Sequence, residues 1–101
     1  MKYSVAVLPS AWEDLKQIED YYLITFGADT ALKVSDSLLN AMERLETFPD
    51  SGSLTPDHWL NRQGYRMVIC KKHVIIYRLI GDIIYIYHIA DTQTQYMKLF
   101  T

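Results

Sequence analysis

The sequence predicts an α+β fold in which two helices cover one face of a small sheet. Apolar residues repeat at helical spacing in the first half of the chain, between Ala11 and Leu45. The second half contains three short apolar runs, at 65–70, 73–80 and 83–90. Two residues separate each run from the next, and such gaps are typical of antiparallel hairpins. A strand-like run at residues 2–8 comes first, so we expect the order strand, helix, helix and a three-stranded antiparallel meander in one sheet.

The two helices are expected to form an antiparallel hairpin. Ser10 and Glu13 match a capping box at the start of the first helix, and Gly27 follows its last turn as a terminator. Asp29 is placed to cap the second helix, which Pro49 would end. The short connection at Gly27 favours antiparallel packing of the two helices.

The segments outside these elements are expected to be less regular. Between Pro49 and Gly64, glycine, proline and polar residues break both periodicities, which predicts a long loop. The last residues, 91–101, are polar and then apolar, which predicts a final helical turn that packs back on the fold. A chain of 101 residues can build one hydrophobic core, so we expect residues 1–101 to form a single domain.

Both faces of the predicted sheet are apolar. The last strand alternates between two sets, Ile84 and Ile86 on one face, and Tyr85, Tyr87 and Ile89 on the other. Two helices can cover only one face, and soluble monomers seldom expose large apolar patches. We therefore expect part of the second face or its rim to be a groove for a partner protein. The alternative is that the preceding loop covers this face with Leu54, Trp59 and Leu60.

The two halves of the chain carry opposite net charges. Residues 1–60 hold four Lys/Arg and ten Asp/Glu, a net charge of −6, whereas residues 61–101 hold six and two, a net charge of +4. From Arg62 to Arg78 there is no acidic residue. This basic stretch could meet phosphates or an acidic protein, and the alternative is a set of solvated charges at strand ends. The candidate phosphate or target contacts in it are Arg62, Lys71, Lys72 and His73.

The sequence gives little support for metal or nucleotide chemistry. The three histidines are not spaced as metal ligands, and there is no phosphate-binding loop or nucleophile elbow. We therefore expect no metal and no other cofactor. A metal-free ribonuclease would need a base, an acid and cations at one phosphate. Arg66, Arg78, His73 and His88 are groups of the right types, but the sequence does not indicate that they converge.

The expected location is the cytoplasm. The single cysteine, Cys70, cannot form an intramolecular disulfide, so nothing requires an oxidising compartment. The apolar start of the chain is shorter than a signal peptide. No run approaches the roughly 20 apolar residues that span a bilayer, and we expect no contact with a membrane.

Several short motifs occur in an order that resembles the RelE/ParE superfamily of toxins. They are Tyr3-Ser-Val, Asp14-Leu15, Tyr21-Tyr22, Phe48-Pro49-Asp50-Ser51-Gly52, Gly64-Tyr65-Arg66, Val74 to Arg78 and Ile84 to His88. The resemblance covers nearly the whole chain. It implies a growth-inhibiting cytoplasmic toxin of a type II toxin–antitoxin or plasmid stabilisation system, held inactive in a complex with a cognate antitoxin. Tyr77, Tyr85 and Tyr87 of the apolar sheet are then the candidate antitoxin contacts.

The superfamily contains two kinds of toxin, and the RelE-like kind cleaves mRNA in the ribosome. The resemblance implies that such activity relies on basic residues of the central strands and on an arginine and a tyrosine near the C-terminus. Arg66 matches one basic position, but a position that is arginine in those nucleases falls near Val74. Tyr96 is kept, whereas Gln93 stands where relatives often carry arginine. The candidate catalytic residues are therefore Arg66, Arg78, His88 and Tyr96, and Gln93 is a further candidate contact to the target.

The ParE-like kind inhibits DNA gyrase without a nuclease site. The long helical hairpin and the Phe-Pro-x-x-Gly loop resemble this branch more closely. The sequence pI of about 5.8 also fits poorly with binding to ribosomal RNA, which draws on many phosphate contacts. We therefore favour a gyrase inhibitor, with a ribosome-dependent mRNA endonuclease and a non-toxic antitoxin-binding module as alternatives. Only the endonuclease would make the chain an enzyme.

Overall fold

The computed structural model describes residues 3–93 and 96–100, apart from the side chains of Tyr96 and Met97. The elements are β1 (Ser4–Val7), α1 (Pro9–Phe26), α2 (Ala28–Arg44), β2 (Ser53–Leu54), α3 (His58–Arg62), β3 (Arg66–Cys70), β4 (His73–Ile80), β5 (Ile83–Asp91) and a C-terminal 3-10 helix (Tyr96–Phe100). The predicted α+β class is confirmed, as are the helical hairpin and the antiparallel meander β3-β4-β5. Within the described residues, no helix has both the length and the apolar character needed to cross a membrane.

The strands form one five-stranded sheet with the order β1-β5-β4-β3-β2. β1 runs parallel to β5, with Ser4 opposite Ile83 and Val7 opposite Ile86, so the sheet is mixed. Parallel neighbours need a long connection between them. The helical hairpin together with β2, β3 and β4 provides that connection.

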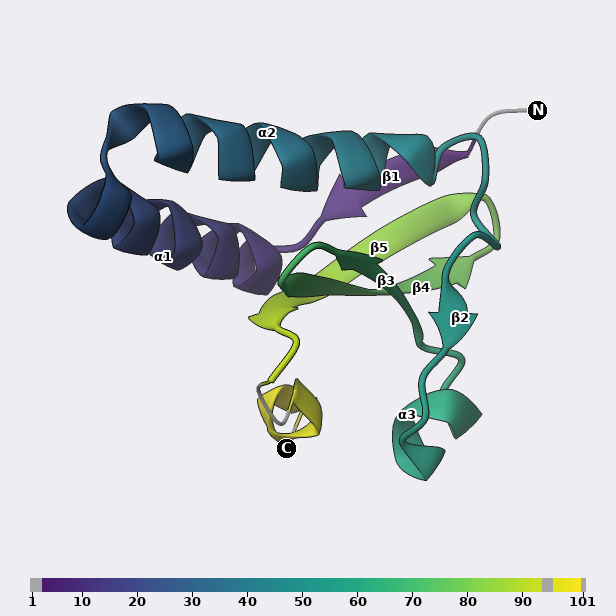
Figure 1. Ribbon diagram of the computed structural model, residues 1–101. Helices are drawn as coiled ribbons and strands as arrows, with labels where there is room; N and C mark the ends of the chain where they lie inside the picture. Colours follow the sequence, from purple (N-terminus) through teal and green to yellow (C-terminus); the bar gives the residue numbers. More distant parts are fainter. Residues whose placement is uncertain (1–2, 94–95, 101) are drawn as a thin grey trace.

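The sheet lies between two layers of unequal size. The hairpin of α1 and α2 covers one side, whereas α3 and the C-terminal 3-10 helix lie on the other side (Figure 1). Leu38, Ile75 and Ile84 are buried in the core between the hairpin and the sheet, and burial of side chains of this size contributes roughly 1.5–3 kcal/mol each. The buried Ser35 joins the two helices, because its Oγ donates to Oε1 of Glu19 at 2.5 Å.

The two predicted helix caps are wrong. α1 begins at Pro9 without a side-chain cap, because proline has no N–H to satisfy and a φ already suited to the first helical turn. Ser10 therefore lies inside the helix, and its Oγ donates to the carbonyl of Tyr87 at 2.6 Å. α2 begins directly after Gly27, whose φ of 98° turns the chain between the helices. Asp29 consequently lies in the first turn of α2 and makes no cap hydrogen bond.

The segment before β3 is more ordered than the predicted long loop, since it contains β2 and α3. Asp57 caps α3 by accepting the N–H of Leu60 on Oδ1 at 3.0 Å. Leu60 is fully buried on the second face of the sheet, whereas Leu54 and Trp59 are 50% and 52% exposed. Phe100 of the C-terminal helix packs on the same cluster. The second face is therefore covered both by the segment before β3, through Leu60, and by the C-terminal 3-10 helix, through Phe100.

Side-chain alternation in β5 is interrupted by a β-bulge. The register with β4 shifts between Ile76 and Tyr77, and the shift leaves Tyr87 without a pairing residue. As a result, Ile89 turns toward the hairpin and joins Ile86 in the core. The prediction that Ile89 shares a face with Tyr87 is therefore wrong.

Candidate functional site

An arginine lies between aromatic rings on the sheet face opposite the hairpin. The guanidinium carbon of Arg78 is 5.0 Å from the centre of the Tyr65 ring and 5.3 Å from that of Tyr87. Phe100 approaches from the C-terminal helix, with its ring centre 4.8 Å from Tyr65 and 5.1 Å from His88. We call Tyr65, Arg78, Tyr87, His88 and Phe100 the arginine–aromatic cluster.

The Arg78 guanidinium is already engaged within the protein. Nη2 donates to Oη of Tyr87 at 2.8 Å, and Nη1 donates to the carbonyl of Gln63 at 3.3 Å. Its Nε is buried and has no partner in the described part of the chain. Burial raises the pKa of Tyr65, although the Arg78 charge opposes this effect, so Tyr65 is a neutral phenol at neutral pH. The cluster therefore offers a fixed cation among rings that pack edge-to-face or tilted, and Tyr65 is not a ready base.

His88 is tied to the helical hairpin. Its Nδ1 lies 2.7 Å from Oδ2 of Asp14, and the same oxygen accepts the backbone N–H of Ile89 at 3.0 Å. The side chains of His88 and Asp14 are only 17% and 19% exposed. A carboxylate against Nδ1 fixes the orientation of an imidazole, which leaves Nε2 as the nitrogen that could exchange a proton with a substrate.

Arg66 lies on the opposite face of the sheet from Arg78. Arg66 is opposite Tyr77 in the β3–β4 register, so both side chains point to the hairpin side, whereas the next residue, Arg78, points the other way. Nη1 of Arg66 donates to the carbonyl of Gly52 at 2.9 Å, and Nη2 lies 3.8 Å from Asp50. Arg78 and His88 thus lie on one face of the sheet and are linked through the rings of Tyr65 and Phe100, whereas Arg66 lies on the other face.

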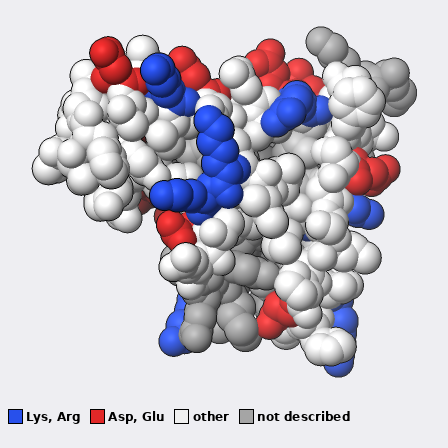
Figure 2. All heavy atoms as spheres, viewed as in Figure 1, with Lys and Arg blue, Asp and Glu red and all other residues white. Residues whose placement is uncertain are grey.

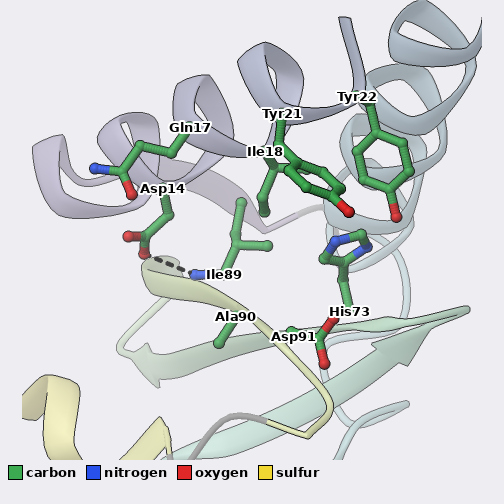
Figure 3. Close-up of a pocket in the computed structure, with 9 residues that line it drawn as sticks. All are labelled: Asp14, Gln17, Ile18, Tyr21, Tyr22, His73, Ile89, Ala90 and Asp91. Atoms are coloured by element: carbon green, nitrogen blue, oxygen red, sulfur yellow. Dashed lines mark hydrogen bonds between the residues drawn. The ribbon is translucent and has the colours of Figure 1, made fainter. Parts of the chain in front are cut away.

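Two pockets that share lining residues lie beside the hairpin, the first between α1 and the adjoining ends of β4 and β5, and the second between the hairpin and the turn that joins β3 to β4. The first has a volume of about 240 Å³ and is shown in Figure 3; it is lined by Asp14, Gln17, Ile18, Tyr21, Tyr22, His73, Ile89, Ala90 and Asp91. The second has a volume of about 230 Å³ and is lined by Tyr22, Val34, Ser37, Leu38, Cys70, Lys71, Lys72 and His73. Because both contain Tyr22 and His73, we call the two pockets together the hairpin cleft. Lys71, Lys72 and His73, predicted as phosphate or target contacts, therefore lie in one cleft.

His73 lines both pockets of the hairpin cleft. Only 7% of the residue is exposed, and its ring centre is 6.0 Å from that of Tyr22. Burial lowers the pKa of His73, although the Asp91 charge opposes this effect. His73 is therefore mainly neutral at pH 7 and cannot serve there as a charged phosphate contact.

The lowered pKa of His73 predicts a loss of stability on acidification. Its unfolded-state pKa is about 6.5, so below that pH the unfolded chain binds a proton that the folded chain still excludes, and unfolding becomes easier until the folded pKa is passed. We expect the urea concentration at the unfolding midpoint to decrease as the pH is lowered from about 7.5 to about 5.5. The decrease should be smaller in His73→Gln. His58→Gln, at an exposed position, should keep the wild-type pH dependence. The same fall in all three proteins would show that His73 does not contribute.

The residues predicted to contact a phosphate or the target do not form one surface. Arg62 is exposed on α3, whereas Lys71 and Lys72 are exposed at the other end of β3. In Figure 2, Lys and Arg side chains gather where the β3–β4 turn meets the hairpin, and Asp and Glu lie along the helices. Gln93 is exposed beyond β5, where its N–H donates to Oδ1 of Asp91 at 2.8 Å. The side chain of Tyr96 lies outside the described residues.

The three tyrosines predicted to contact an antitoxin occupy different environments. Tyr77 is completely buried beneath the hairpin, where its Oη donates to the carbonyl of Pro49 at 2.7 Å and accepts the N–H of Gly52 at 3.1 Å. It is not part of any accessible surface. Tyr85 and Tyr87 are half-buried on the other face, and Tyr87 belongs to the arginine–aromatic cluster.

Sequence reasoning missed the two carboxylates of the hairpin cleft, Asp14 and Asp91. Asp14 carries a weak signal, because it lies beside the apolar stripe of α1 and so faces partly inward. Asp91 has no such signal in the sequence. It is the last residue of β5, and it reaches the cleft only because the pairing of β4 with β5 places it opposite His73. Among the described residues, no three side chains of the metal-ligating types gather closely enough to hold an ion.

Comparison with known proteins identifies the family. The chain matches the family model described as the ParE toxin of the type II toxin–antitoxin system, parDE, over residues 5–96. Its fold is similar to a chain of the chromosomal ParDE system from P. aeruginosa, with a TM-score of 0.77 and 22% identity over 91% of this chain and 98% of that chain. It is also similar to a chain of the RelBE2 toxin–antitoxin complex from Mycobacterium tuberculosis, with a TM-score of 0.68 and 14% identity over 90% and 99%. No curated protein sequence matches the chain. Because the family model spans most of its length, the chain belongs to the ParE toxins of type II toxin–antitoxin systems.

Proposed function

We propose that this toxin inhibits DNA gyrase and is neutralised by a cognate antitoxin protein. The observation that carries the proposal is the separation of Arg66 from the arginine–aromatic cluster. Cleavage of RNA without a metal needs a base, an acid and cations around one phosphate. Arg66 instead binds the Gly52 carbonyl on one face of the sheet, and Arg78 is stacked between two rings on the other. This arrangement favours DNA gyrase over mRNA as the target of the toxin.

The surface of the helical hairpin supports a protein target. Its tip exposes the large apolar side chains Tyr21, Leu23, Ile24, Phe26 and Leu32, and Ile24 is 85% exposed. α1 and α2 also carry more acidic than basic residues. Exposed apolar patches mark protein interaction sites, whereas RNA is bound largely through cations at its phosphates. A hairpin of this character suits gyrase or an antitoxin better than ribosomal RNA.

A supercoiling assay tests the proposal directly. Purified toxin is added to gyrase and relaxed plasmid, alone or with the antitoxin purified from the co-expressed pair. We expect loss of supercoiling or trapped cleaved plasmid, reversed by the antitoxin. Full supercoiling at excess toxin, combined with mRNA cleavage in a translating extract, would support the ribosome-dependent endonuclease instead. Full supercoiling without cleavage would support a non-toxic antitoxin-binding module.

A His88→Gln variant extends the same test to growth arrest in cells. A general acid or base contributes about 10²–10⁴-fold to a rate, so an endonuclease that uses His88 should lose nearly all toxicity in this variant. A gyrase inhibitor should keep its toxicity in the His88→Gln variant. His58→Gln, at an exposed position, is the matched control, and thermal unfolding of both variants shows whether loss of the Asp14 contact has destabilised the fold.

A further inference from the structure

The hairpin cleft carries opposite charges at its two ends. Asp14 and Asp91 line the first pocket, and no Lys or Arg is among the described residues that line it. Lys71 and Lys72 line the second pocket, whose described lining contains no Asp or Glu. His73 lines both pockets and, being mainly neutral at pH 7, adds no competing charge. A cleft of this kind matches a segment with charges of both signs and disfavours one that is uniformly charged.

The first pocket suits a cationic side chain. Figure 3 shows Tyr21 and Tyr22 reaching down from α1 toward His73, with Asp14 further along the same helix and Asp91 at the end of β5. Asp14 uses only Oδ2 for its contacts with His88 and Ile89, so the other oxygen is not needed for them. Tyrosine rings attract ammonium and guanidinium groups by about 0.5–1 kcal/mol at exposed sites. A Lys or Arg side chain would therefore meet ring faces and carboxylates together.

The second pocket suits an apolar side chain next to a carboxylate. Val34, Leu38 and Cys70 supply apolar wall, and Lys71 and Lys72 are exposed at the rim. Lys71 adopts a positive φ of 58° at the β3–β4 turn, which sets the position of the rim. An apolar group can fill the space between the walls while a neighbouring Asp or Glu meets the two ammonium groups.

We propose that the hairpin cleft binds a segment of the antitoxin that places a Lys or Arg side chain in the first pocket. The same segment places an apolar side chain, with an adjacent Asp or Glu, in the second pocket. This inference rests on the proposed neutralisation by an antitoxin and adds the place and chemistry of one contact. RNA or DNA is a poorer occupant, since its phosphates would be repelled by Asp14 and Asp91.

Charge reversal at each end of the cleft tests the inference. Asp91→Lys alters the first pocket and Lys72→Glu the second, while Asp82→Lys and Lys16→Glu make the same changes at exposed positions outside the cleft. We expect each cleft variant to raise the Kd of the toxin for its purified antitoxin by about ten-fold or more. The control variants should change Kd by less than about three-fold. Gln17→Lys, exposed in the first pocket, replaces Asp91→Lys should that variant fail to fold.

The pattern of signs separates the possible occupants. A partner with both charges binds less well to both cleft variants, whereas a polyanion binds Lys72→Glu less well and Asp91→Lys better. The polyanion pattern, cleft variants that bind like the controls, or a wild-type toxin that binds no antitoxin would each overturn the inference.

The supercoiling assay distinguishes this inference from the proposed target. Asp91→Lys, at a residue with no predicted role toward the target, should still inhibit gyrase, but its inhibition should escape reversal by the antitoxin. If wild-type toxin leaves supercoiling intact while the expected pattern of Kd values is found, gyrase inhibition is refuted and the cleft inference is supported.

Discussion

Replacing Gly52 with alanine should destabilise the fold by about 2–3 kcal/mol. A Cβ at this position would lie 2.5 Å from Oη of Tyr77 and 2.7 Å from the carbonyl oxygen of Met67. Neither atom can move cheaply, because Tyr77 is fully buried and the Met67 carbonyl belongs to the backbone of β3. Glycine is therefore required at position 52 because there is no room for a side chain. For a chain of this size the loss corresponds to a fall in Tm of roughly 10–20 °C.

Thermal unfolding followed by far-UV circular dichroism measures this effect. Ser53→Ala is the matched control, since Ser53 is the next residue and is exposed. Its free energy of unfolding should stay within about 0.5 kcal/mol of the wild-type value. If Gly52→Ala and Ser53→Ala unfolded at the same temperature, the close approach of Gly52 to β3 and Tyr77 would be wrong.

The main elements could be predicted because they depend on local patterns. Helical periodicity between Ala11 and Leu45 located the hairpin, and the two-residue gaps after residues 70 and 80 located the meander. The pairing of β1 with β5 could not be predicted in this way. Ser4 and Ile83 meet only through the packing of the whole chain, and no local pattern specifies a partner so distant in sequence.

Local rules failed where a neighbouring residue imposed a stronger constraint. Ser10 and Asp29 both match the preferences of helix caps, but Pro9 starts α1 and Gly27 separates the helices. The bulge at Tyr87 has no signal in a run of alternating apolar residues. Its register shift is a property of the paired strands and not of β5 alone.

The sequence indicates the chemical types of the candidate site residues, but it does not give their relative positions. By residue type, Arg66 and Arg78 are equally suited to meet a phosphate, yet they lie on opposite faces of the sheet. A two-residue turn at Lys71 and Lys72 sets Cys70 opposite His73, and counting back along the strands sets Arg66 opposite Tyr77. The register that separates the two arginines was therefore available from the turn length. The positions of the carboxylates in the hairpin cleft were not, since they depend on how α1 lies over β5.

Replacing Tyr77 with phenylalanine should cost about 1–3 kcal/mol. The hydroxyl donates to the carbonyl of Pro49 and accepts the N–H of Gly52, and both of these residues are buried. Phenylalanine fills the same space but leaves a buried donor and a buried acceptor without a partner. Tyr21→Phe, at an exposed position, is the matched control and should unfold like the wild type.

Alkaline unfolding provides a second measurement on the same variant. Burial raises the pKa of Tyr77, although the hydrogen bond from Gly52 and the charge of Arg66 oppose this effect. The unfolded tyrosine loses its proton near pH 10, so stability is retained below that pH and lost as the pH rises through the folded pKa. Tyr77→Phe should lose less of its stability across this range than the wild type or Tyr21→Phe. Equal losses in all three would argue against a buried hydroxyl at this position.

The double variant Gly52→Ala/Tyr77→Phe should lose less free energy of unfolding than the two single variants lose together. Oη of Tyr77 is the atom closest to the added Cβ, and phenylalanine lacks it. The contact with the Met67 carbonyl remains, so the alanine still costs free energy in the double variant, but less than it does alone. We expect a coupling free energy of about 0.5–1 kcal/mol or more from a double-mutant cycle of urea unfolding. Gly52→Ala with Tyr21→Phe should instead be additive, because Tyr21 is exposed on α1 and Gly52 is buried against β3. Additive free energies in both pairs would mean that the Tyr77 hydroxyl does not meet Gly52, and the loop from Pro49 to Gly52 would then be attached to the sheet by other contacts.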